Sequence, residues 1–327
     1  MRVLVTGGSG FLGSHVAEQL ARAGHTVRAL VRRSSNRKFL QTLANVEFAE
    51  GSVEQADRVE EAMKGGVDAV IHAAGLVKAR SEAEFWDTNV QGTKNLLAAA
   101  KKHAPGLKRF VFVSSLEVSG PAQGGLPVPV AQEQPMSAYG RSKLEAERAC
   151  KAVKDELPIT ILRPTAVYGP RDNEMVEVFR SVSRGVLPIT GDGSVKLTFV
   201  YGPDCGAACI RAVEASVPSG STYFVSDGQI YVWREAVEDV EAALGKRALV
   251  RIGVPFAILD TVAVGVEAFG KLRNKAVMLT REKAKVIRQS WVCGIEETTR
   301  DLGWKPEVMW REGTKLTADW YRRERWI

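Results

Sequence analysis

The N-terminal stretch Val3-Leu-Val-Thr-Gly-Gly-Ser-Gly-Phe-Leu-Gly13 decides the fold class of this chain. Its apolar start predicts a buried strand, its glycines predict a tight turn, and an amphipathic helix is expected from Phe11 onward. Three of the glycines are spaced three residues apart, namely Gly7, Gly10 and Gly13. This spacing is typical of a strand-to-helix turn that brings bare backbone and a helix N-terminus against a pyrophosphate. The stretch therefore predicts an α/β protein with a dinucleotide site.

Length and composition limit the remaining classes. A chain of 327 residues suffices for one large α/β domain with an appendage, or for two modest domains. The net charge of +7 is mild, and nucleic-acid binding, which calls for a denser basic patch, is not expected. The four cysteines lack metal-site spacing, and no secretory segment precedes the first strand. We expect a cytoplasmic protein with free thiols and no bound metal.

The end of the second strand indicates which cofactor is bound. This strand is expected over Thr26 to Val31, and its end lies about twenty residues after the last glycine, where an NAD site places an acidic residue on the ribose. The chain instead carries Arg32 and Arg33, followed by Arg37. Guanidinium groups can bind a 2′-phosphate in bidentate fashion, so NADP is expected, with NAD as the second choice. The alternative is a solvated loop that happens to be basic.

Further strands are expected over 46–49 and at Asp68-Ala-Val-Ile-His-Ala-Ala-Gly75, which ends in small residues. Small side chains at the carboxyl end of a strand allow a ligand to approach the crevice of the sheet closely. His72 lies inside this strand, where a lone histidine is usually structural. A helix is expected from Thr88 to Leu97, with Asn89 on the turn nearest the crevice.

A serine pair and a Tyr-x-x-x-Lys motif carry the candidate chemistry. The strand Arg109 to Val113 ends in Ser114-Ser115, and a helix is expected around Ser137-Ala-Tyr-Gly-Arg-Ser-Lys143. Tyr139 and Lys143 are four apart and share one face of that helix. An ammonium group near the phenol lowers its pKa, which gives an acid/base that works near neutrality. A serine hydroxyl at the strand end can bind the same substrate oxygen.

Together these segments resemble the extended short-chain dehydrogenase/reductases, a group within the NAD-dependent epimerase/dehydratase superfamily. The motifs that carry the resemblance are Thr6-Gly-Gly-Ser-Gly-Phe-Leu-Gly13, His72-Ala-Ala-Gly75, Asn89-Val-Gln-Gly-Thr93, Ser114-Ser115, Tyr139-Gly-Arg-Ser-Lys143, Leu162-Arg-Pro-Thr-Ala-Val-Tyr-Gly-Pro-Arg171, and Leu302-Gly-Trp-Lys-Pro306 with Glu312-Gly313 and Trp320-Tyr321. The basic end of the second strand and residues 254–291 look most like the dihydroflavonol reductase and 3β-hydroxysteroid dehydrogenase branch. Nucleotide-sugar epimerases are the next nearest group.

The resemblance implies roles for the matched positions. Tyr139 would be the general acid/base, Lys143 would lower its pKa and hold the nicotinamide ribose, and Ser115 would orient the substrate oxygen, with Asn89 completing the catalytic group. The implied cofactor contacts are Gly7, Gly10, Phe11, Leu12, Gly13, Arg32, Arg33, Arg37, Ser52, Val53, Ala73, Ala74, Gly75, Lys143 and Pro164. Ser52 departs from the family, which usually has an aspartate there. The resemblance also implies a homodimer through the helices beginning near Asn89 and Tyr139.

The expected fold is a doubly wound parallel sheet (Rossmann) with a smaller C-terminal substrate lobe. Residues 1–165 would form the NAD(P)-binding domain and residues 166–327 mostly the lobe. Segments from about 195–225 would return to the first domain, with strands at 196–201 and 222–225 joining the main sheet. Lobe helices are expected over 174–184, 204–214, 232–244 and 255–272.

The stretch from Val254 to Leu272 is apolar but is interrupted by Asp260 and Glu267, so it predicts an amphipathic helix and no membrane span. Basic residues follow it, namely Lys271, Arg273, Lys275, Arg281, Lys283, Lys285 and Arg288. A lobe helix with a solvated basic face is the first interpretation. A peripheral membrane contact is the alternative.

The sequence thus predicts an NADP-dependent oxidoreductase that interconverts a small-molecule ketone or aldehyde and a secondary alcohol. The second hypothesis is a nucleotide-sugar epimerase or dehydratase with tightly bound NAD. That enzyme would need a diphosphate site in the lobe, for which Arg171, Arg180 and Arg184 are candidates. A third hypothesis is a cofactor sensor without catalysis, since fold does not fix function.

Overall fold

The computed structural model describes residues 1–273, 275–277 and 279–327. Its main element is a seven-stranded sheet in the order β11-β6-β5-β4-β1-β2-β3, in which every neighbouring pair is parallel. The strands are β1 (Arg2–Thr6), β2 (Thr26–Val31), β3 (Val46–Glu50), β4 (Ala69–His72), β5 (Arg109–Val113), β6 (Ile159–Pro164) and β11 (Ser221–Val225). The strand order reverses between β1 and β4. A crevice for ligands is expected outside the carboxyl ends of these two strands.

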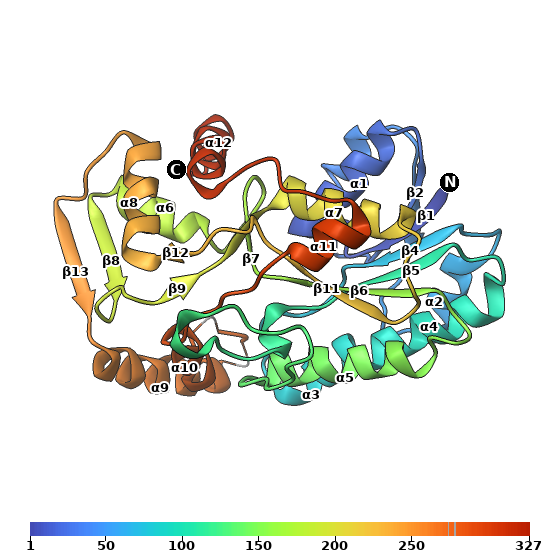
Figure 1. Ribbon diagram of the computed structural model, residues 1–327, viewed down its shortest axis with the longest axis horizontal. Helices are drawn as coiled ribbons and strands as arrows, with labels where there is room; N and C mark the ends of the chain where they lie inside the picture. The colour runs from blue at the N-terminus through green and yellow to red at the C-terminus, as the bar shows by residue number, and fades with distance from the viewer. Residues whose placement is uncertain (274, 278) are drawn as a thin grey trace.

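Helices cover both faces of this sheet, as Figure 1 shows. One face carries α1 (Phe11–Arg22), α7 (Gly202–Glu214) and α11 (Glu296–Leu302), and the other carries α2 (Ala56–Met63), α4 (Gly92–His103) and α5 (Ala138–Ala152). Along β1, Val3 and Val5 are buried in the core of the first face, whereas Leu4 is buried in the core of the second. Successive strand residues point to opposite faces, so a sheet covered on both sides needs continuous apolar strands. The predicted doubly wound sheet is confirmed.

Short elements connect the strands on the ligand side. They are α3 (Glu82–Phe85), a π-helical segment η2 (Trp86–Gln91), and the 3₁₀ turns η1 (Leu40–Thr42), η3 (Leu116–Val118) and η4 (Gln123–Gly125). The helix expected from Thr88 is therefore a π-helical turn that continues into α4. Such turns often occur at functional sites.

The second lobe lies at the opposite end of the molecule from β1 and β2 (Figure 1). Its elements are β7 (Ala166–Tyr168), α6 (Val176–Ser183), β8 (Val186–Thr190), β9 (Lys196–Leu197), β10 (Phe199–Tyr201), β12 (Tyr231–Val232), α8 (Trp233–Leu244), β13 (Val250–Val254), α9 (Phe256–Leu272), α10 (Arg281–Ile287) and α12 (Trp310–Arg323). Its core is built around the fully buried Trp310, whose ring stacks on Phe199 at a centroid distance of 4.0 Å. The smaller C-terminal lobe is therefore present as well.

One strand prediction is wrong. Residues 196–201 were expected to join the main sheet, but β9 pairs antiparallel with β12, and β10 pairs with β7. The place beside β6 is taken by β11, which pairs with β6 over its full length. Thr198, between β9 and β10, bonds through its backbone N–H to Trp291 and accepts a bond from Thr165. These contacts hold the segment where the lobe joins the sheet.

Candidate active site

A cleft of about 1440 Å³ runs along the carboxyl ends of the strands and extends to α9 and α10 of the lobe. The three predicted glycines line it together with the two residues between the last two of them; these lining residues are Gly7, Gly10, Phe11, Leu12 and Gly13. Gly7 has a φ of 73°, and a Cβ there would lie 2.7 Å from the backbone nitrogen of Ala74. A Cβ on Gly13 would overlap the carbonyl of Gly7. These two positions therefore require glycine for conformation and close packing.

The N-terminus of α1 fits a dinucleotide. Gly10, its N-cap residue, supplies no capping side chain, and the first turn contains no acidic residue. A Cβ on Gly10 would meet only the Gly7 carbonyl, at 3.2 Å, so the backbone there faces open space. The first N–H groups of the helix and its dipole are thus left for an anionic ligand.

Most of the other predicted cofactor contacts line the same cleft. They are Arg32, Ser52, Val53, Ala73, Ala74, Gly75, Lys143 and Pro164. Gly75 is held close, because a Cβ there would lie 3.1 Å from the Asn89 side-chain oxygen and 3.4 Å from the Lys143 nitrogen. The backbone N–H of Ser52 donates to the Gln55 side chain at 3.1 Å. The small residues after β4 therefore border the cleft directly.

A second, smaller pocket of about 470 Å³ opens at the ends of β2 and β3. It is lined by Arg32, Arg33, Glu50, Gly51, Ser52, Gln55 and Arg58. Arg32 and Arg33 were both predicted to lie at this site. Arg58, in α2, was missed because no sequence motif marks it. Arg37 is placed differently: its guanidinium donates to Glu50 at 2.9 Å and to the Arg32 carbonyl at 3.3 Å. Arg37 therefore offsets the one acidic side chain among the pocket-lining residues.

The predicted catalytic helix begins where expected. The Ser137 hydroxyl caps α5 by accepting from the backbone N–H of Gly140, and Tyr139 and Lys143 line the cleft one turn apart. Lys143 Nζ donates to the Val113 carbonyl at 2.6 Å and lies 4.5 Å from the centroid of the Phe112 ring. Burial lowers the pKa of Lys143 to about 8. The ammonium is therefore fixed at the end of β5, at the wall of the cleft.

Tyr139 differs from the prediction in its electrostatics. Burial, and secondarily the carboxylate of Glu117, raise the pKa of the phenol well above its usual value, while a hydrogen bond from Ser115 lowers it. The Lys143 ammonium, which was expected to lower this pKa, donates its hydrogen bond to the Val113 carbonyl. The reason for the raised pKa is desolvation. Removing the phenol from water disfavours its charged form more than the hydrogen bond from Ser115 favours it. The phenol is thus held protonated.

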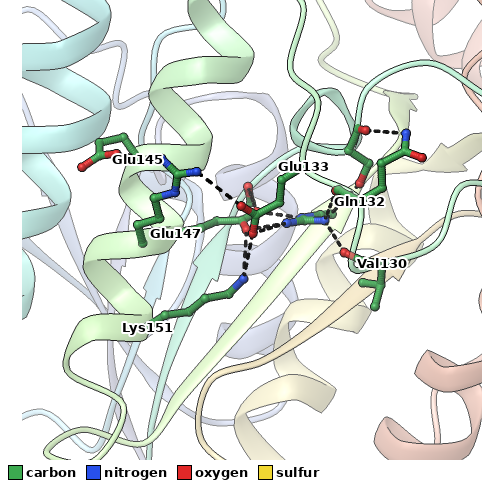
Figure 2. A network of polar contacts seen from close by, with 10 residues as sticks. Val130, Gln132, Glu133, Glu145, Glu147 and Lys151 are labelled. Atoms are coloured by element: carbon green, nitrogen blue, oxygen red, sulfur yellow. Dashed lines mark hydrogen bonds and ion pairs between the residues drawn. The ribbon is translucent and has the colours of Figure 1, made fainter.

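The two serines after β5 have different partners. Ser115, the predicted one, lines the cleft beside Tyr139, whereas the Ser114 hydroxyl donates to Glu147 at 2.5 Å. Glu147 lies at the centre of a polar network (Figure 2). It receives two parallel hydrogen bonds from Arg163, of 2.8 and 2.7 Å, and both side chains are 0% exposed. This buried pair fixes the strand end that presents Ser115.

Helix α10 of the lobe reaches the start of the catalytic helix. Glu282 accepts from the backbone N–H of Ala138 at 2.8 Å and pairs with Arg141 at 3.3 Å. Lys283 pairs with Glu117 at 3.4 Å, and Glu117 also accepts from the Ser137 hydroxyl. Sequence reasoning missed these contacts, because about 150 residues separate the two helices in the chain.

Asn89 and His72 are hydrogen-bonded to other groups of the protein. The Asn89 amide donates to the Leu76 carbonyl and to the Ser142 hydroxyl and accepts from the Leu76 N–H, so it ties the loop after β4 to α5. Asn89 is buried and its bonds are to protein groups, which places it behind the cleft. His72 is buried between the hydroxyls of Thr6 and Thr93, in the structural role expected for it.

Comparison with known proteins identifies the family of this chain. Residues 3–226 match the NAD dependent epimerase/dehydratase family. The chain belongs to this family. Members are NAD(P)-dependent enzymes with the extended short-chain dehydrogenase/reductase fold, so the protein is an enzyme of this class, either an oxidoreductase or an epimerase.

Relatives within the family include both reductases and epimerases. The 2-alkyl-3-oxoalkanoate reductase of Stenotrophomonas maltophilia is 31% identical, with 96% of this chain and 98% of the relative covered. The ceramide reductase of Caulobacter vibrioides is 29% identical, with 99% and 96% covered. Among solved structures, UDP-glucose 4-epimerase of Thermotoga maritima with UDP-glucose is similar with a TM-score of 0.81, at 25% identity and 99% coverage of both chains.

Proposed function

We propose that the protein is an NADP-dependent oxidoreductase that interconverts a ketone or aldehyde and a secondary alcohol. The observation that carries this proposal is that Ser115, Tyr139 and Lys143 line the same cleft as the glycine turn. The cleft is large enough for a dinucleotide and a small substrate together. The similarity to two relatives named as reductases supports the same choice.

The chain's own residues handle the substrate oxygen in this reaction. When bound, the nicotinamide supplies or accepts a hydride at the substrate carbon. Tyr139, which burial keeps protonated, donates its proton to the carbonyl oxygen, and the Ser115 hydroxyl donates a hydrogen bond to the same oxygen as negative charge develops. Lys143, fixed by the Val113 carbonyl, would hold the cofactor ribose, and its positive charge would favour the phenolate that remains. In alcohol oxidation the same groups act in reverse.

The choice of NADP rests on the smaller pocket. Arg32, Arg33 and Arg58 line it, and Glu50, its one acidic lining residue, is paired with Arg37. A 2′-phosphate would meet several guanidinium groups there, while the bare 2′-hydroxyl of NAD would leave them without an anionic partner. Charge-assisted hydrogen bonds contribute about 1.5–3 kcal/mol each, so a preference of at least about tenfold for NADPH is expected.

The second candidate is a nucleotide-sugar epimerase, which the similarity to UDP-glucose 4-epimerase favours. Such a protein must bind a sugar diphosphate in the lobe. Arg171 is already engaged, because it donates to Glu18 at 2.8 Å and to Ser14 at 2.9 Å. Arg180 donates to Glu177 and to the Trp326 carbonyl. Two of the three arginines considered for that site are therefore held by protein groups, which favours the reductase.

Substitution of the acid/base tests the proposal. Purified protein is mixed with NADPH and a panel of ketones and aldehydes, and cofactor oxidation is followed by absorbance. With an active substrate found in this way, Tyr139→Phe should lower kcat by at least about 100-fold, the typical scale of acid/base catalysis, and leave NADPH binding within about twofold. Tyr223→Phe is the matched control, because it removes a phenol hydroxyl that bonds Asp301 outside the cleft.

Two results would contradict the proposal. Wild-type turnover by the Tyr139→Phe variant would remove Tyr139 from the mechanism. A protein that retains tightly bound NAD through purification and consumes no NADPH with any carbonyl compound, but converts a nucleotide sugar, would establish the epimerase instead.

A further inference from the structure

Helix α9 presents an apolar face to solvent, and both of its acidic residues are paired with arginines. Ile258, Val262, Phe269 and Leu272 are 54%, 47%, 57% and 81% exposed. They recur at intervals of three, four and seven residues, so they lie on one face of the helix. The acidic residues are directed to the opposite side, where Asp260 pairs with Arg288 and Glu267 pairs with Arg281. The Glu267 side chain is 18% exposed and that of Asp260 48%, so of the two only Glu267 is largely covered.

Exposed apolar side chains are concentrated in this part of the molecule. In the part of the chain that the structure describes, eight of the fourteen large apolar side chains counted as exposed lie within residues 249–272, which form β13 and α9. Single exposed apolar residues are normal, whereas a contiguous apolar patch marks a surface that contacts a membrane or another molecule. None of the described helices, α9 included, is long and apolar enough to cross a bilayer.

Positive charge is in excess in this part of the chain, although Arg281, Lys283 and Lys285 line the cleft and Arg251 and Arg288 are paired with carboxylates. Residues 246–288 contain ten Lys or Arg and three Asp or Glu, an excess of seven that equals the net charge of the entire chain. Arg273 and Lys275, which follow α9, are both exposed, and the Arg273 guanidinium lies 5.2 Å from the centroid of the Phe269 ring. A second copy of this chain placed on the face would bring two such basic regions together. An anionic surface would instead be complementary to it.

We propose that the outer face of α9 lies on an anionic lipid surface, with its apolar side chains at the headgroup boundary and the adjacent Arg273 and Lys275 on lipid phosphates. Apolar area supplies affinity for the interface, and each Lys or Arg near an anionic leaflet contributes a factor of about five in partition. This proposal goes beyond the oxidoreductase activity and does not depend on it.

The position of α9 links that surface to the cleft. Glu267, on the inner side of the helix, lines the cleft, and α10, which is paired to α9, contacts the first residue of α5 through Glu282. Figure 1 shows α9 along the outer edge of the lobe with α10 beside it. A bilayer on the outer face of α9 would therefore lie beside the helix pair that borders the cleft.

Vesicle sedimentation tests the proposal without any turnover. Cofactor-free protein is mixed with vesicles of phosphatidylcholine alone or with phosphatidylglycerol added, and the bound fraction is measured at low and high salt. Wild-type protein should bind the anionic vesicles, with binding that falls as salt rises. The double variant Ile258→Ser/Phe269→Ser should bind at least tenfold less, while Leu126→Ser, a change at a 70% exposed apolar residue elsewhere, should bind as the wild type does. Circular dichroism checks that each variant is folded.

The proposal is overturned if wild-type protein stays in the supernatant with both kinds of vesicle. It is also overturned if the folded Ile258→Ser/Phe269→Ser variant binds as tightly as the wild type, or if wild-type protein is a dimer that this variant converts to monomers without any vesicle binding. The last result would identify a second copy as the occupant of the face. None of these outcomes affects the oxidoreductase proposal, which the Tyr139→Phe assay decides separately.

Discussion

Replacing Arg163 by methionine should be among the most destabilising single changes in this protein. Arg163 Nε and Nη2 bond the two Glu147 oxygens, and Nη1 donates to the Val130 carbonyl at 2.7 Å and to the Ser119 hydroxyl at 3.0 Å. Both charged side chains are fully buried. Removing the guanidinium leaves the Glu147 carboxylate with the Ser114 hydroxyl and with Lys151 at 3.9 Å. An uncompensated buried charge of this kind costs about 3–5 kcal/mol of unfolding free energy.

Urea denaturation measures this loss directly. The Arg163→Met and Glu147→Leu single variants are compared with the double variant, in which no charge remains buried and unpaired. The double variant should lose less than the sum of the two single losses, with a coupling of at least about 1 kcal/mol, because each single change already destroys the pair. Losses below about 1 kcal/mol for Arg163→Met, or strictly additive losses, would refute the reasoning.

Three further predictions concern the cofactor pocket, a buried acid and the acid/base. Arg58→Ala should weaken NADPH binding about tenfold and leave NADH binding unchanged in calorimetric titration, a result that equal losses for both cofactors would contradict. Burial raises the pKa of Asp172 from 3.8 to about 6, so the folded protein binds this proton more tightly than the unfolded chain. The stability that this group contributes is therefore fully present below about pH 3.8 and is lost as pH rises through about 6. Relative to Asp172→Asn, the wild type should lose up to about 3 kcal/mol between about pH 3 and pH 7, and a constant difference would exclude the effect. Because the Glu117 carboxylate raises the pKa of Tyr139, Glu117→Gln should move the pH profile of alcohol oxidation to lower pH, and an unmoved profile would contradict this assignment.

The main sheet could be predicted because its signals are local. β2 and β5 have the expected bounds, and β1 differs by one residue at each end, since buried parallel strands are continuous apolar runs between glycine or charged turns. The glycine turn, Ser115, Tyr139 and Lys143 follow from motifs with fixed spacing, and the structure brings them to one cleft. Their catalytic roles, the homodimer and the cytoplasmic location stay predictions.

The remaining features depend on contacts between distant segments, which a single sequence does not specify. The strand expected at 196–201 pairs inside the lobe, because β11 occupies the edge next to β6. The pKa of Tyr139 is set by burial and by Glu117, two properties of the folded chain. The sequence predicted an amphipathic helix over 254–272, but it did not show that Glu267 would pair with Arg281 and Asp260 with Arg288, residues that follow the helix in the chain.

The central claim, an NADP-dependent enzyme, is tested most directly by calorimetric titration of the cofactor-stripped protein with NADPH and NADH side by side. Phosphate contacts from Arg32, Arg33 and Arg58 predict that NADPH binds at least about tenfold more tightly than NADH. Tighter binding of NADH, or an NAD molecule that cannot be stripped from the protein, would contradict the claim and favour the nucleotide-sugar epimerase.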